Sequence, residues 1–146
     1  MLACVFENGT KTSLRHVVTD NLVLRDDQIL LIHRIKGLEQ RKWGLPGGYV
    51  ERDETIEESA KREILEETGY EVKVFKFLRI KDSPNRPSED RQNVSFVHTC
   101  TVGDKVGEAD DESSEQKWFQ LAALPPREEI AFDQFYDIQF YLNSKH

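Results

Sequence analysis

A run without glycine or proline, from Thr55 to Thr68, constrains the fold more than any other part of the chain. The residues Asp53-Glu54-Thr55 stand at its start and Gly69 follows it directly. Asp and Thr cap helices, negative charge suits the N-terminal end of a helix, and glycine commonly ends one in the left-handed conformation. The pattern therefore predicts a helix over 55–68 that Gly69 terminates.

Runs rich in β-branched and aromatic residues lie on both sides of this helix and predict a sheet. The turn Arg25-Asp26-Asp27 joins two of these runs into an expected pair. Asn8-Gly9 follows the apolar Cys4-Val5-Phe6 and predicts a hairpin. The expected strands are 15–24, 28–34, 70–80, 93–102 and 117–121, with a short one within 43–48.

Polar loops and a second helix complete the expected arrangement. Residues 81–92 and the stretch 103–116, which holds six acidic residues, predict loops. Apolar residues at helical spacing predict a helix over 127–142. With 146 residues and no internal repeat or linker, the chain is expected to form one domain over 1–146, a mixed sheet packed by two helices.

Composition disfavours several classes of protein. The formal net charge of -7 argues against a protein that binds a nucleic-acid backbone through many cationic contacts. Only Cys4 and Cys100 are present, without the spacing of a disulfide framework or a zinc site. The sequence has no apolar run long enough to span a bilayer and no signal-peptide pattern, so a cytoplasmic location is expected.

Glu63, Glu66 and Glu67 are expected to form one acidic patch, because these spacings place them along one edge of the predicted helix. Like charges this close repel each other and require a positive partner. Mg²⁺ or Mn²⁺ would suit such a set of carboxylate oxygens, and Arg62 could pair with Glu54. The spacing alone also fits a surface helix rich in glutamate, so it leaves both readings open.

The segment from Gly48 to Tyr70 resembles the Nudix box. Gly48, Glu54 and the run Arg62-Glu63-Ile64-Leu65-Glu66-Glu67-Thr68-Gly69-Tyr70 fill its fixed positions, with Tyr70 in place of the usual aliphatic residue. Trp43 to Gly48 resembles the segment that leads into the box. Trp118-Phe119 with Leu124-Pro125 resembles a late strand and turn of the same family.

The resemblance implies an α/β (α+β) fold, an α/β/α sandwich with a mixed sheet, that hydrolyses a diphosphate linkage in nucleoside diphosphate derivatives with Mg²⁺ or Mn²⁺. It implies that Gly48, Glu54, Arg62 and Gly69 maintain the motif. The metal ligands would be Glu63, Glu66, Glu67 and the Gly47 carbonyl. Glu66 or Glu67 could act as general base, and Glu112, with Glu115 second, could supply a base or ligand from the acidic loop, which could equally be a solvated surface loop.

Substrate preference rests on weaker features outside the box. Arg86 and Arg91 flank a loop that could contact phosphate or ribose, or could simply keep the loop soluble. Pro84 and Pro87 lie near a proline that ADP-ribose hydrolases of this family tend to carry, which favours ADP-ribose or a similar nucleotide sugar. The alternatives are a hydrolase of nucleoside triphosphates, including oxidised ones, and a non-catalytic nucleotide sensor. The resemblance also makes a homodimer possible.

Overall fold

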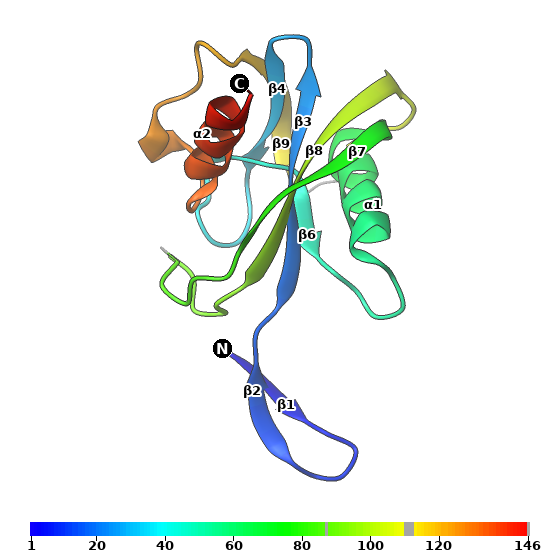
Figure 1. Cartoon of the computed structure of the whole chain (residues 1–146), viewed down its shortest axis with the longest axis vertical. Coiled ribbons are helices and arrows are strands. Elements are labelled where there is room, and N and C mark those ends of the chain that lie inside the picture. The colour runs from blue at the N-terminus through cyan, green and yellow to red at the C-terminus, as the bar shows by residue number, and fades with distance from the viewer. Residues whose placement is uncertain (87, 110–112, 146) are drawn as a thin grey trace.

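The computed structural model describes residues 1–86, 88–109 and 113–145, and its centre is a mixed β-sheet with a helix on each face (Figure 1). The strands hydrogen-bond in the order β5-β4-β3-β8-β7, with β6 paired to β3 and β9 to β4. β3 and β8 run parallel and their other pairings are antiparallel. The bounds are β3 Val17–Arg25, β4 Gln28–Arg34, β5 Trp43–Gly44, β6 Gly47–Tyr49, β7 Tyr70–Lys81, β8 Val94–Lys105 and β9 Ser113–Gln120. The predicted fold class is confirmed.

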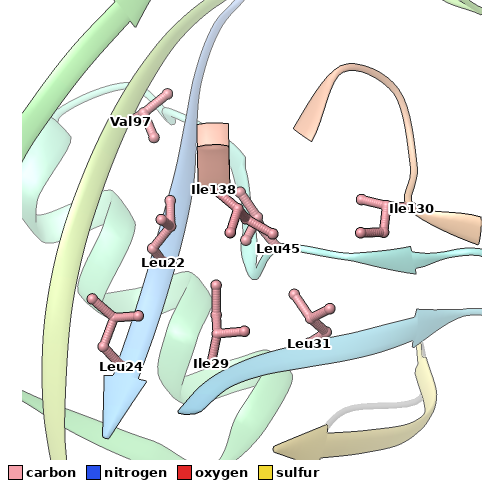
Figure 2. Close-up of a cluster of buried hydrophobic side chains, with 8 residues drawn as sticks. All are labelled: Leu22, Leu24, Ile29, Leu31, Leu45, Val97, Ile130 and Ile138. Carbon is pink, nitrogen blue, oxygen red and sulfur yellow. The ribbon is translucent and has the colours of Figure 1, made fainter. Parts of the chain in front are cut away.

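Two hydrophobic clusters fill the spaces between the sheet and its helices. Successive side chains of a strand point to opposite faces, and β3 is apolar at consecutive positions because both of its faces are buried. Leu22 and Leu24 therefore pack toward α2 (Gln134–Ser144), in the cluster that Figure 2 draws. Val23 packs on the other face against Ile64 of α1.

Helix α1 (Ile56–Thr68) forms where the sequence predicts it. The Thr55 hydroxyl accepts from the Glu58 amide at 3.1 Å, and the Glu58 carboxylate accepts from the Thr55 amide at 2.9 Å, which satisfies two otherwise unpaired donors. Gly69 ends the helix with φ 80°, and its amide donates to the Leu65 carbonyl at 2.9 Å. These caps set where the glutamates of the helix lie.

The predicted loop 103–116 is shorter than expected. β8 extends to Lys105, which pairs with Tyr70 of β7, and β9 begins at Ser113. Gln116 pairs with Ile32 of β4, so cross-strand pairing overrides the polar composition of the segment.

The predicted helix over 127–142 is interrupted. A 3₁₀ turn, η1, covers Arg127–Glu129, and α2 begins only at Gln134. Between them the Ala131 amide donates to the Trp43 carbonyl at 2.8 Å, and Phe132 adopts a positive φ of 54°. This contact with β5 draws the backbone out of the helix, which apolar spacing alone could not reveal.

The predicted hairpin forms from β1 (Leu2–Val5) and β2 (Lys11–Leu14), and it projects from the body of the molecule (Figure 1). Arg15, directly after it, clamps the loop between β7 and β8. Its Nε donates to the Gln92 carbonyl at 2.6 Å and its Nη2 donates to the Asp82 carbonyl, at the two ends of that loop.

Among the described residues, none of the helices has the length and apolarity that a transmembrane span requires.

Candidate active site

The glycine pair Gly47-Gly48 brings β6 against both β3 and α1. A Cβ on Gly47 would lie 1.9 Å from the Thr19 carbonyl oxygen, and a Cβ on Gly48 would lie 2.5 Å from a carboxylate oxygen of Glu63. Backbone cannot move aside cheaply at such distances, so glycine is required at Gly47 for the pairing of β6 with β3. The same pair leaves room for the carboxylates of the helix.

Glu63, Glu66 and Glu67 line one cleft with Gly47 and Gly48, and the cleft has a volume of about 540 Å³. Glu67 is 6% exposed, and its carboxylate accepts from the Gly47 amide at 2.9 Å. The Glu66 side chain is 50% exposed at the opening. The structure thus brings together the glutamates that the sequence assigns to a metal site.

Arg62 holds the loop before α1 onto the helix. Its Nε and Nη2 donate to the two carboxylate oxygens of Glu54 at 3.0 and 2.8 Å, a bidentate pair, and Nη2 also donates to the Tyr49 carbonyl at 3.2 Å. The guanidinium of Arg62, followed by the Glu51 amide, lowers the pKa of Glu54 to about 2. The same hydrogen bonding raises the pKa of Arg62, so both groups stay charged.

The remaining donor of this guanidinium reaches the acidic patch. Nη1 of Arg62 donates to Glu63 at 3.0 Å and to Glu66 at 3.2 Å. Within the described residues, no three His, Cys, Asp or Glu side chains converge on one point as a ready metal-binding group. Arg62 and the Gly47 amide thus engage the carboxylates, whose side chains would have to rotate to converge on a cation.

The residues nevertheless have the donor chemistry of a divalent-cation site, and they line one cleft. Hard cations prefer oxygen ligands, and carboxylates of Glu63, Glu66 and Glu67 line the cleft beside the backbone of Gly47. The close approach of Glu63 to Gly48 leaves no room for a side chain there. The resemblance to the Nudix box implies a divalent metal, and this donor set agrees with that.

The candidates outside the box lie in different environments. Glu112 lies outside the described residues. Glu115 is exposed on β9 opposite His33 and is not among the residues that line the cleft. Arg86 lines the cleft but is buried, and its Nη2 donates to Asp133 at 2.9 Å. Arg91 also lines the cleft, is exposed, and donates to the Tyr49 hydroxyl at 2.7 Å.

The structure adds cleft residues that the sequence did not single out. Gln134, the first residue of α2, accepts from the Leu45 amide at 2.9 Å and donates to Asp20 at 3.1 Å, so it ties three distant segments together. Glu89 and Asn93 come from the loop clamped by Arg15. No local pattern marks these residues, because tertiary contacts alone bring them to the cleft.

His98 has no part in the cleft. It is buried, stacks on Phe75 with ring centroids 4.3 Å apart, and lies 3.3 Å from the Asn21 side chain through Nδ1. Burial lowers its pKa to about 4. His98 is therefore a neutral core residue at pH 7.

Comparison with known proteins places this site in a family. The family model of the NUDIX domain matches residues 14–137. An ADP-ribose pyrophosphatase of Methanocaldococcus jannaschii is 36% identical over 130 residues, covering 89% of this chain and 75% of that protein. An oxidized purine nucleoside triphosphate hydrolase of Mus musculus is 33% identical over 112 residues, covering 71% of this chain and 65% of that protein.

A solved structure agrees with the fold. A NUDIX hydrolase from Nitrosomonas europaea superposes with a TM-score of 0.79 at 23% identity, covering 97% of this chain and 79% of that one. At this identity the likeness concerns the fold. The matched family model, the relatives and the filled Nudix box together show that this chain belongs to the Nudix family and is a Nudix pyrophosphohydrolase.

Proposed function

We propose that the chain hydrolyses the diphosphate linkage of ADP-ribose or a similar nucleotide sugar, with Mg²⁺ or Mn²⁺ as cofactor. The observation that carries the proposal is the presence of Glu63, Glu66 and Glu67 in one cleft with the backbone of Gly47 and Gly48. A volume of about 540 Å³ lies within the range of small-molecule sites. The 36% identical pyrophosphatase named for ADP-ribose supports the choice of substrate.

The acidic residues would hold the cation and direct the attacking water. When bound, the divalent cation supplies positive charge for the diphosphate and acidifies water. Glu63, Glu66 and Glu67 would hold it, with the Gly47 carbonyl as a further ligand. Glu66 or Glu67 would accept the proton of the water that attacks phosphorus, and the exposed Glu66 can reach solvent most easily.

Arg62 and Glu54 would keep this arrangement in place without touching the reacting atoms. Their bidentate pair fixes the loop before α1, and the Arg62 guanidinium offsets the charge of the neighbouring glutamates. Gly48 and Gly69 would serve the same purpose through the backbone. Glu112 remains our first choice for a further base or ligand from the acidic segment.

The variant Glu67→Gln tests the catalytic part of this proposal. Glutamine can still accept from the Gly47 amide, so the fold should persist while kcat falls by on the order of 10³-fold. Glu57→Gln is the matched control, because Glu57 lies on the same helix and pairs at the surface with Lys61 at 2.9 Å. Near-normal turnover of Glu67→Gln in saturating Mg²⁺ would overturn the assignment.

Reaction products separate the two candidate substrates. Release of AMP and ribose 5-phosphate from ADP-ribose supports the leading proposal. The mouse relative named for oxidized purine nucleoside triphosphates favours a second candidate, a nucleoside triphosphate hydrolase, which would release a nucleoside monophosphate and pyrophosphate. A non-catalytic nucleotide sensor would bind these compounds and release neither set of products. The same assay, run with Mg²⁺ and with Mn²⁺, identifies the preferred metal.

A further inference from the structure

A short turn, residues 45–47, enters β6 and is held by two buried polar side chains from outside the acidic patch. The Leu45 amide donates to Oε1 of Gln134 at 2.9 Å. The Pro46 carbonyl accepts twice from Asn21, at 2.9 Å from the backbone amide and at 3.1 Å from Nδ2. Gln134 is 4% exposed and Asn21 is fully buried. Burial of such side chains is costly unless they are hydrogen-bonded, and here their hydrogen bonds converge on one turn.

The hydrogen bond from the Asn21 amide to Pro46 also determines which way the backbone of Gly47 faces. Gly47 pairs with Asp20 of β3, and this hydrogen bond lies directly beside the pair. The pair is therefore of the antiparallel kind whose members do not bond to each other, so the amide and carbonyl of Gly47 both point away from β3. The amide meets Glu67 on that side at 2.9 Å. The carbonyl faces the same side, toward α1, which lies across β6 from β3 (Figure 1).

β6 is too short to keep this orientation by itself. It has three residues, Gly47–Tyr49, and the first two are glycines, which leave the backbone free to adopt other conformations. Asn21 lies on the face of the sheet that α1 covers, where its Oδ1 is 3.3 Å from Nδ1 of His98. Gln134 belongs to α2 on the other face and donates to Asp20 at 3.1 Å. The turn is therefore held from both faces, by side chains that are themselves fixed by a second contact.

We propose that Asn21 and Gln134 are positioning residues for the metal site, which hold the turn so that the Gly47 carbonyl faces the cation together with the acidic patch. Neither side chain would touch the reacting atoms. This inference rests on the metal site of the proposed function and does not depend on which nucleotide is cleaved. It assigns a role in metal binding to two residues outside the Nudix box.

Titration with Mn²⁺ in the absence of substrate tests this role. Asn21→Ala removes the Nδ2 donor, and Gln134→Met keeps the length of the side chain but removes its hydrogen bonds. Loss of a group that orients a metal ligand typically weakens metal binding 10–100-fold, so each variant should raise the Kd for Mn²⁺ by at least about tenfold. Wild-type affinity for Mn²⁺ in both variants would overturn the inference.

Matched controls separate positioning from a general loss of stability. Val23→Ala is the control for Asn21→Ala, because Val23 is fully buried on the same face of β3, two residues further on. It removes buried methyl groups, so its Tm should fall, but its Kd for Mn²⁺ should stay at the wild-type value. Gln139→Met controls for Gln134→Met, because Gln139 is on the same helix and does not line the cleft. An equal loss of Mn²⁺ affinity in the controls would overturn the inference.

Hydrogen exchange at the Gly47 amide reports on the turn without any metal. Exchange followed by NMR should be faster in Asn21→Ala and Gln134→Met than in their controls, because the turn opens more easily. Unchanged exchange in both would count against the inference. If Asn21→Ala does not fold, Gln134→Met compared with Gln139→Met decides alone.

The product assay keeps this inference apart from the proposed function. Suppose that wild type releases no AMP from ADP-ribose while Asn21→Ala and Gln134→Met lose affinity for Mn²⁺: the proposed substrate would then be wrong and the positioning role would stand. Release of AMP by wild type, together with wild-type Mn²⁺ affinity in both variants, would do the reverse. Mn²⁺ binding that Glu67→Gln does not weaken would place the cation elsewhere and overturn the positioning role as well.

Discussion

The Gly47 amide donates a hydrogen bond of 2.9 Å to the carboxylate of Glu67, joining a strand end to the last turn of α1. The contact is possible because β6 lies directly against β3, where a Cβ on Gly47 would come within 1.9 Å of the Thr19 carbonyl. The position of a central carboxylate of the cleft therefore depends on the absence of a side chain at Gly47, on the strand that pairs with β3.

Gly47→Ala should consequently damage stability and activity together. The added methyl group must push β6 away from β3, at a cost of about 1–3 kcal/mol or more, and the Gly47 amide should then lose Glu67. Gly107→Ala is the control, because a Cβ there would meet nothing within 4 Å. Urea denaturation and kcat measurements check both variants, and wild-type kcat in Gly47→Ala would contradict the proposed dependence.

Glu54 should contribute stability that disappears in acid. Its pKa falls from 4.5 to about 2 in the folded chain, through Arg62 first and the Glu51 amide second. As the pH falls, the Glu54 carboxylate is therefore protonated at a lower pH in the native state than in the unfolded state. Its contribution to stability is complete above pH 4.5 and is lost as the pH falls toward 2. The difference in unfolding free energy between wild type and Glu54→Gln should shrink over this interval. A difference that stays constant down to pH 2.5 would disprove the pairing.

His98 should make the fold sensitive to acid in a higher pH range. Burial lowers its pKa from 6.5 to about 4, so between these values the unfolded chain binds a proton that the native chain does not. Stability should fall by about 3 kcal/mol as pH drops from 6.5 to 4. His98→Gln should remove this pH dependence of stability, whatever the substitution does to stability at pH 7. Chemical denaturation at several pH values measures how the unfolding free energy changes with pH. The same change in His98→Gln as in wild type would refute the prediction.

Arg86 and Arg91 should respond differently to replacement by alanine. Arg86→Ala removes the buried cation beside Glu89 and one of the two cations that pair with Asp133, the other being Lys81, and loss of one member of a buried ion pair costs about 3–5 kcal/mol. Arg91 is exposed and contacts Tyr49, so Arg91→Ala should keep its Tm and raise KM if the guanidinium meets substrate phosphate. Melting curves and KM values distinguish them. Equal changes in Tm for the two variants would contradict the different roles assigned to Arg86 and Arg91.

Local chemistry explains which elements the sequence could predict. α1 follows from Thr55, the unbroken run after it and Gly69, all of which act within a few residues. The acidic patch follows from helical spacing, and its pattern with Gly48 identifies the family. The break before α2 could not be foreseen, since it arises from the contact of Ala131 with Trp43 far away in the sequence.

The site beyond the box depends on pairings that no local pattern encodes. Arg86 is an ordinary loop arginine in the sequence, and only Asp133, contributed by the segment before α2, reveals it as a buried cation. Asn93 is likewise an ordinary polar residue until the parallel pairing of β8 with β3 places it beside the cleft. Long-range contacts of this kind determine which loop residues line the cleft.

The clamp of Arg15 on both ends of the loop between β7 and β8 has a consequence for engineering new specificities. Because its two hydrogen bonds go to the main-chain carbonyls of Asp82 and Gln92, it holds the loop without regard to the side chains between them. The exposed residues between them, such as Pro84, Asn85 and Asp90, could then be randomised as a cassette, with Arg15, Arg86 and Glu89 kept and with Gly47 and the glutamates of α1 untouched. Variants from such a library could differ in substrate selectivity while they keep the residues proposed to carry out hydrolysis.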